Sequence, residues 1–130
     1  MNTTSEWLQY IQEEQKYFNP DERLKTFKKW VFPNSAKCNA QKMADAGFVY
    51  TGNTKDPDSV QCFFCGKSLD GWEIDDDPHN EHIKHAPNCH YAQLQDDTPV
   101  IQLLSVWEEY TKKLVDRFHE KMSNKLDVLL

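Results

Sequence analysis

The sequence predicts an α+β fold: short helices surround a short three-stranded antiparallel sheet, and a long amphipathic helix follows. A chain of 130 residues has room for one core and an appendage. Caps, turns and short apolar runs alternate up to about residue 95, and an apolar stripe at helical spacing fills the rest. We therefore expect an N-terminal extension with a short helix (1–18), a domain (19–95), and a linker with the long C-terminal helix (96–130).

Local signals predict the elements of the domain. Each predicted helix begins at a capping residue and ends at proline or glycine: Asn19-Pro20 to Pro33, Asn39 to Gly47, and Asp77-Pro78 to Pro87. Two runs rich in aromatic and β-branched residues, 48–51 and 59–63, predict strands joined by a turn at 56–58. Residues 69–73 predict a third, short strand, and Thr98-Pro99 begins the C-terminal helix.

Composition narrows the class of protein. Only 38% of the residues are hydrophobic, so we expect a bound metal to help hold the fold together. Apolar runs fall short of the roughly 18 residues that a membrane span needs, and the N-terminal residues lack an export signal. We therefore expect no membrane insertion and a reducing cytosol or nucleus. The net charge of -6 argues against direct DNA binding and favours a basic or amine-bearing partner.

The cysteines carry the metal prediction. Cys62 and Cys65 have the spacing of a zinc knuckle, and Gly66 permits the tight turn that follows. Cys89 is the nearest remaining thiol, and a helix rich in histidine precedes it. Spacing alone does not choose the fourth ligand among the nearby histidines, which are His79, His82, His85 and His90. A redox pair of the Cys-x-x-Cys type is the alternative interpretation of the first two thiols.

The whole pattern resembles a known family. Cys62, Cys65, His82 and Cys89 are similar to the C-x2-C-x16-H-x6-C signature of the baculoviral IAP repeat (BIR). The resemblance covers roughly residues 20–92, through the runs 23–27, 44–48, 61–65, 71–72 and 76–78. It implies that these four side chains bind one structural zinc ion. Because four protein ligands leave no position for a reactive water, we expect no enzymatic activity and no catalytic residues. The remaining thiol, Cys38, is expected to be buried in the core.

The resemblance also implies a peptide groove. BIR domains hold a peptide with a free N-terminus beside the third strand. On the matching positions, Trp72 would form a pocket for an N-terminal alanine, while Asp76 and Glu81 would bind the α-amine. Leu69 and Asp70 would line the strand along which the peptide pairs. From the residues alone, the competing interpretation is a solvated acidic face with the tryptophan in the core.

One position divides the family. Survivin-like members carry histidine at the place of His85, where caspase-binding members usually carry tryptophan. Together with Lys67, His85 would form a small cationic site for a phosphate group. Such a site suits a histone tail that begins Ala-Arg-Thr and is phosphorylated on that threonine. The alternative is that both side chains are simply exposed to solvent.

The long C-terminal helix predicts protein partners. A helix that outruns its domain cannot bury its whole apolar stripe on that domain. The residues expected to contact partner helices are Leu103, Leu104, Trp107, Leu114, Phe118 and Met122. The resemblance implies INCENP-like and borealin-like helices, as in the chromosomal passenger complex. The competing interpretation is that the helix folds back or self-associates. Residues 92–99 match the dimerisation segment of survivin-like proteins only weakly, which leaves a homodimer open.

Taken together, these expectations describe a non-enzymatic adaptor in mitosis and cytokinesis. It would bind a phosphorylated histone tail and scaffold partner helices at the centromere and spindle midzone, in the nucleus and the cytoplasm. The alternative is an inhibitor of apoptosis, whose groove binds caspases or Smac-like antagonist peptides that begin with alanine.

Overall fold

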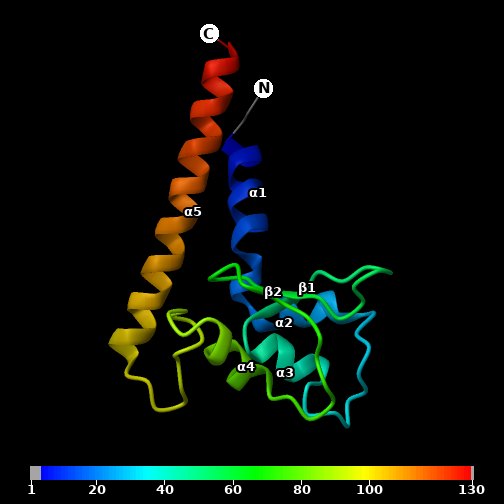
Figure 1. Ribbon diagram of the computed structural model, residues 1–130. Coiled ribbons are helices and arrows are strands. Elements are labelled where there is room, and N and C mark those ends of the chain that lie inside the picture. The colour runs from blue at the N-terminus through cyan, green and yellow to red at the C-terminus, as the bar shows by residue number, and fades with distance from the viewer. Residues whose placement is uncertain (1–3, 130) are drawn as a thin grey trace. The chain divides into compact units, whose positions relative to one another are not determined.

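The computed structural model describes residues 4–129, of which Thr4, Trp7 and residues 125–129 are described by backbone alone. The chain forms two compact units (Figure 1). One unit comprises residues 17–95, and the other joins residues 1–16 to residues 96–130. Within the described residues, no helix combines the length and the apolar character that crossing a bilayer requires.

The first unit is built on a three-stranded antiparallel sheet, as predicted. Its strands are β1 (Phe48–Tyr50), β2 (Val60–Cys62) and β3 (Ser68–Leu69), with β2 in the centre. Gln61 pairs with Val49 on one side and with Ser68 on the other. The third strand is shorter than the predicted 69–73, because Gly71 takes a φ of 72° that turns the chain out of the sheet. β3 is therefore a short edge strand.

Short helices surround this sheet. They are α2 (Pro20–Leu24), α3 (Ala40–Asp45) and α4 (Pro78–His85), with 3-10 turns η1 (Lys16–Phe18) and η2 (Lys25–Phe27). The predicted caps are confirmed: the side chains of Asn19, Asn39 and Asp77 accept backbone N–H groups at 2.9, 2.9 and 3.1 Å. Each cap satisfies a donor that the first turn of a helix leaves without a partner.

The first of these helices ends earlier than the sequence predicts. The apolar pattern predicted a helix that continues to Pro33, whereas η2 ends at Phe27. The hydroxyl of Thr26 donates to the Arg23 carbonyl at 2.6 Å and accepts the Tyr50 backbone N–H at 2.9 Å. These contacts tie the end of the helix to β1, so tertiary hydrogen bonds outweigh local helix propensity here.

A buried arginine organises the core of this unit. Arg23 is fully buried and donates to the carbonyls of Ala44 and Tyr17 at 2.8 and 2.7 Å and to the Tyr91 hydroxyl at 2.6 Å. Its guanidinium lies 4.6 Å from the centroid of the Phe63 ring. Burial lowers the pKa of Arg23, whereas its hydrogen bonds to three carbonyls and the Tyr91 hydroxyl stabilise the charged form. The arginine thus links the N-terminal turns, α3 and the segment after α4.

Cys38 lies in the same core. Its side chain is fully buried, and its thiol donates to the Glu73 carbonyl at 3.2 Å. The expectation that Cys38, the cysteine outside the metal cluster, is buried in the core is therefore confirmed.

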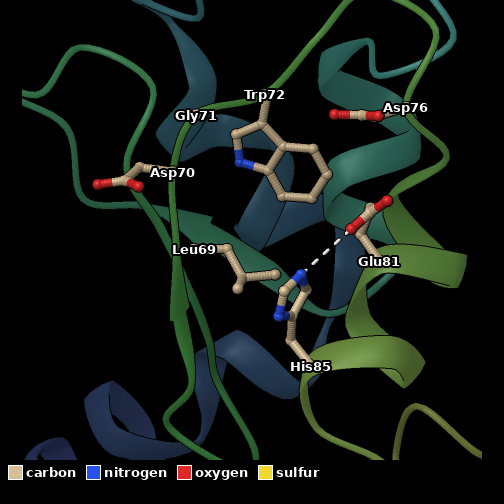
Figure 2. Close-up of a pocket in the computed structure, with 7 residues that line it drawn as sticks. All are labelled: Leu69, Asp70, Gly71, Trp72, Asp76, Glu81 and His85. Carbon is tan, nitrogen blue, oxygen red and sulfur yellow. Dashed lines mark ion pairs between the residues drawn. The ribbon is translucent and has the colours of Figure 1, made fainter.

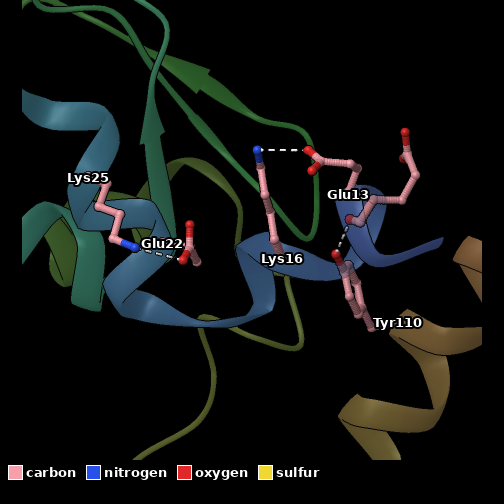
Figure 3. A network of polar contacts seen from close by, with 6 residues as sticks. Glu13, Lys16, Glu22, Lys25 and Tyr110 are labelled. Atoms are coloured by element: carbon pink, nitrogen blue, oxygen red, sulfur yellow. Dashed lines mark hydrogen bonds and ion pairs between the residues drawn. The ribbon is translucent and has the colours of Figure 1, made fainter. Parts of the chain in front are cut away.

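The second unit pairs the two ends of the chain. Helix α1 (Thr4–Gln15) lies beside the long helix α5 (Val100–Leu129) in Figure 1. The Tyr110 hydroxyl donates to the Glu14 carbonyl at 2.9 Å, a contact drawn in Figure 3, which also shows the Lys16–Glu13 ion pair of this unit. The Tyr10 and Phe118 rings lie 6.1 Å apart, so the two helices run antiparallel. The single helix predicted after Pro99 is confirmed, but its pairing with α1 was not predicted.

Candidate metal centre and peptide groove

The first half of the metal centre is a tight turn after β2. The backbone N–H groups of Phe64 and Cys65 donate to the Cys62 sulfur at 3.3 and 3.4 Å. Gly66 closes the turn with a φ of 78° and donates its N–H to the Cys62 carbonyl at 3.1 Å. Both thiols are thereby presented on the same side of the turn, as the Cys-x-x-Cys spacing predicts.

The second half comes from α4 and the residues after it. His82 is fully buried, and its Nδ1 lies 2.7 Å from the Ala46 carbonyl. This hydrogen bond requires the proton on Nδ1, so Nε2 keeps a free lone pair and faces the Cys65 sulfur at 3.7 Å. The Cys62 and Cys89 sulfurs lie 4.0 Å apart.

The structure decides between the histidines that spacing left open. The donor atoms of Cys62, Cys65, His82 and Cys89 all lie within 4.8 Å of one another. His79 instead hydrogen-bonds the Ala92 carbonyl at 2.8 Å, and His85 pairs with Glu81 at 3.3 Å.

The donor set fits zinc. Bonds of about 2.3 Å to sulfur and about 2.0 Å to nitrogen place tetrahedral ligands roughly 3.5–4 Å apart. The separations of 3.7 and 4.0 Å agree with that geometry. Three sulfurs and one imidazole are soft donors that select zinc over magnesium or calcium. The four residues therefore form a site for one structural zinc ion, which fills its coordination sphere with protein ligands.

The pKa shifts of the three thiols also support a bound cation. The hydrogen bond to Cys89, followed by burial, raises the pKa of Cys62, and burial raises the pKa of Cys65. The same bond from Cys62 lowers the pKa of Cys89 to about 4. The protein alone therefore does not favour three thiolates. A divalent cation supplies the positive charge that makes all three stable.

A small pocket lies beside β3 and α4. Its volume is about 120 Å³ (Figure 2). It is lined by Leu69, Asp70, Gly71, Trp72, Asp76, Glu81 and His85. Six of the seven residues predicted to bind a peptide are thus brought together. Trp72 is only 7% exposed and packs edge-on against Phe48 at 5.8 Å, so it is both a core residue and a wall of the pocket.

The pocket carries negative charge on one wall. Figure 2 shows Glu81 between Asp76 and His85, and the Glu81 carboxylate lies 3.3 Å from the His85 Nε2. The Asp76 carboxylate accepts the Glu73 backbone N–H at 2.8 Å, which fixes its position. Burial raises the pKa of Cys38 behind this wall, and Asp76 adds to that rise. The wall therefore has a negative potential that suits a bound cation.

Lys67 does not line this pocket. It lines a second, more open hollow of about 530 Å³, together with His85, Pro87, Asn88 and the Cys65 edge of the metal centre. His85 borders both hollows. The two residues predicted to form a cationic site therefore share one surface, next to the acidic pocket.

The residues predicted to contact partner helices divide into two groups on α5. Leu103, Leu104, Trp107 and Met122 are 42, 50, 39 and 38% exposed. Leu114 is buried, and Phe118 is half-buried against Tyr10. Tyr110, Leu114 and Phe118 recur every four residues on one face, so α1 covers that part of the stripe.

Comparisons with known proteins agree with this geometry. The profile of the BIR family, described as the Inhibitor of Apoptosis domain, matches residues 23–93. The chain belongs to the BIR family. Baculoviral IAP repeat-containing protein 5.2-B of Xenopus laevis is 35% identical over 116 residues, which is 89% of this chain and 71% of that protein.

A second relative places the chain within the BIR family. Baculoviral IAP repeat-containing protein 5 of Rattus norvegicus is 45% identical over 75 residues, 58% of this chain and 53% of that protein. The chain is thus a survivin-like BIR protein that spans 53–71% of the lengths of these two relatives. The crystal structure of the DIAP1 BIR1 domain bound to a Grim peptide matches with a TM-score of 0.48 and 30% identity, covering 62% of this chain and 79% of that one.

Sequence reasoning missed three residues that shape this BIR domain. The first two are the buried Arg23 and the half-buried Tyr91, whose hydroxyl accepts a hydrogen bond from the arginine. The available signal was a charged residue on the apolar face of a predicted helix. Asp58 was interpreted only as part of a turn, but its carboxylate accepts the Trp72 backbone N–H at 2.8 Å. The two residues of this hydrogen bond are fourteen positions apart, so no local sequence pattern predicts it.

Proposed function

We propose that this chain is a non-enzymatic, survivin-like adaptor. Its groove binds a histone tail that begins with a free Ala-Arg-phosphoThr, and α5 scaffolds INCENP-like and borealin-like helices in the chromosomal passenger complex. It acts in mitosis and cytokinesis, at the centromere and spindle midzone in the nucleus, with a pool in the cytoplasm. A zinc ion held by four protein ligands has no position for a reactive water, which supports a binding role.

The observation that carries the proposal is the acidic pocket at the edge of the sheet. Asp76 and Glu81 lie beside the Trp72 wall in a space of about 120 Å³. An α-ammonium gains charge-assisted hydrogen bonds from two carboxylates, and the small space fits a methyl side chain. β3 is an edge strand, so a peptide can pair with it along its backbone. A free N-terminal alanine satisfies all of these conditions together.

The position of His85 supports the phosphate in the proposal. An extended peptide advances about 3.3 Å per residue, so its third residue lies roughly 7 Å from its first. His85 borders the acidic pocket and also the hollow that holds Lys67. A phosphate on the third residue would reach these two side chains. The arginine at the second position would lie near Asp70 at the edge of the groove.

The uncovered part of α5 supports the helical partners. Leu103, Leu104, Trp107 and Met122 stay exposed although α1 packs against the neighbouring face. Exposed apolar side chains in a row on a long helix favour contact with other helices. A homodimer through the same surface is the competing use of these side chains.

A peptide titration tests the proposed groove. The zinc-loaded chain is titrated with an Ala-Arg-Thr tail, its phosphothreonine form, its N-acetylated form and an Ala-Val-Pro-Ile peptide. We expect the phosphopeptide to bind most tightly and acetylation to weaken binding at least about tenfold, since it removes a charge-assisted hydrogen bond. The double variant Lys67→Ala, His85→Ala should lose the preference for phosphate while it keeps the preference for a free N-terminus.

The same titration can contradict the proposal. If the phosphate adds nothing and the Ala-Val-Pro-Ile peptide binds more tightly, the groove belongs to an inhibitor of apoptosis that binds caspases or Smac-like peptides. If acetylation changes nothing, the pocket does not bind an α-amine at all.

A further inference from the structure

The loop between β1 and β2 reaches the back of the peptide pocket through one carboxylate. The Oδ2 atom of Asp58 accepts the backbone N–H of Trp72 at 2.8 Å. The loop itself is ordered by its own hydrogen bonds. The Asn53 side chain accepts the N–H groups of Lys55 and Asp56 at 2.9 and 2.8 Å, and the Thr51 and Ser59 hydroxyls lie 3.1 Å apart. Asp58 is therefore presented from a fixed support.

Trp72 needs such a support because the sheet does not hold it. The pairing of β3 ends at Leu69, and Gly71 turns the chain just before Trp72. The indole Nε1 is buried, and among the described residues it has no hydrogen-bond partner. The ring is thus positioned by its contact with Phe48 and by its own backbone. Asp58 supplies the hydrogen bond that fixes that backbone, and a charged acceptor makes it a strong one.

The position of this ring sets the size of the pocket. Trp72 is one wall of a space of about 120 Å³ that Asp76 and Glu81 also line. In so small a space, a shift of the wall by a fraction of an ångström decides whether one additional methylene group is accepted. A methylene in an apolar pocket changes affinity roughly 10- to 200-fold.

We propose that Asp58 is a positioning residue of the peptide pocket, which fixes Trp72 and thereby sets the preference for alanine as the first residue of the peptide. The inference rests on the proposed function, because it assumes that this pocket receives a free N-terminal residue. It adds a residue outside the groove that controls specificity without touching the peptide.

The test compares three variants of the zinc-loaded full chain. Asp58→Ala removes the acceptor, whereas Asp58→Asn keeps a carbonyl oxygen in the same place without the charge. Asp56→Ala is the matched control, since it removes an exposed carboxylate from the same loop and its contacts described above use the backbone N–H. The probes are Ala-Arg-Thr peptides whose first residue is alanine, glycine or 2-aminobutyrate. Zinc content and thermal unfolding confirm that each variant is folded.

The expected result is a change in selectivity. Asp58→Ala should bind the alanine peptide about tenfold more weakly, because the Trp72 amide loses its partner. Its preference for alanine over 2-aminobutyrate should fall at least fivefold, and the Trp72 amide resonance in the ¹⁵N spectrum should shift upfield. Asp58→Asn should restore most of the selectivity, and Asp56→Ala should match the parent chain.

Two results overturn the inference and leave the proposed function intact. One is an unchanged alanine preference in Asp58→Ala, even if all the affinities fall together. The other, should Asp58→Ala not fold, is an unchanged preference in Asp58→Glu, which moves the oxygen by one methylene. If the parent chain binds none of the three peptides, the proposed function itself has failed.

Discussion

The two units of this chain are stabilised by different interactions. Residues 17–95 contain short strands and short helices that converge on the zinc ligands and on the buried Arg23. The paired helices α1 and α5 rely on an apolar stripe, one buried tyrosine and surface ion pairs. The first unit therefore converges on a few specific polar and metal-ligating residues, whereas the second is stabilised by contacts repeated along two helices. That difference suits the proposed peptide groove, which needs side chains in fixed positions, and the proposed partner-binding helix, which needs exposed apolar side chains.

Loss of a zinc ligand should have the largest effect. We expect Cys89→Ser to unfold residues 17–95, because zinc binding contributes on the order of 10–16 kcal/mol to folding in small zinc domains. The helical signal of α5 should survive in circular dichroism while near-ultraviolet bands of the domain disappear. Cys38→Ser is the matched control, since that thiol is buried but lies outside the cluster. Equal loss of structure in both variants would contradict the assignment.

Replacement of Arg23 should have the next largest effect. Arg23→Met leaves the Ala44 and Tyr17 carbonyls without their donor, so we expect a loss of about 3 kcal/mol in urea unfolding with saturating zinc. Lys25→Ala removes an exposed ion pair with Glu22 and should cost about 0–1 kcal/mol. If both variants unfold at the same urea concentration, the buried arginine does not organise the domain.

The affinity for zinc should weaken as the pH is lowered. Burial and the Cys62–Cys89 hydrogen bond raise the pKa of Cys62, and burial raises that of Cys65, so zinc must displace protons from these thiols. More protons compete at lower pH, and each one displaced changes the apparent affinity about tenfold per pH unit. Between about pH 7.5 and pH 6.5 the zinc Kd should therefore rise roughly tenfold or more, as measured by competition with a chromophoric chelator. A flat profile would mean that thiolates exist before zinc binds.

A substitution on α5 should affect only partner binding. Leu104→Glu places a charge on the uncovered stripe, and we expect at least about tenfold weaker capture of INCENP-like and borealin-like helical segments. Ser105→Glu is the matched control, because it adds the same charge at the neighbouring exposed position. Neither change should alter zinc content or peptide affinity. Equal binding by both variants would show that this stripe does not hold the partner helices.

The features that could be predicted from the sequence are those that depend on contacts between residues close together in the chain. Asn39 and Asp77 cap their helices through residues three positions ahead, and the Cys-x-x-Cys turn is equally local. The choice of His82 needed the family resemblance, because it depends on the Ala46 carbonyl 36 residues away. For the same reason the Asp58 contact with Trp72 and the pairing of α1 with α5 could not be predicted from local patterns.

The end of the helical segment after Asn19 shows the same limit. Its apolar spacing fitted a helix up to Pro33, but α2 ends at Leu24 and η2 at Phe27. The Thr26 hydroxyl accepts the Tyr50 N–H, a contact across 24 residues, and the Trp30 indole donates to the Cys38 carbonyl. Six of the seven residues predicted for the groove line one pocket, and Lys67 lies in the adjacent hollow. Their role in peptide binding stays a prediction.

The most direct test of the account is a map of where the peptide binds. A ¹⁵N-labelled, zinc-loaded chain is titrated with Ala-Arg-phosphoThr and followed by NMR. We predict shifts confined to those of residues 65–89 that line the two hollows, including Trp72, Glu81 and His85, with the resonances of α5 unchanged. Shifts that concentrate on α5, or no shifts at saturating peptide, would contradict the central claim that residues 17–95 form the recognition unit.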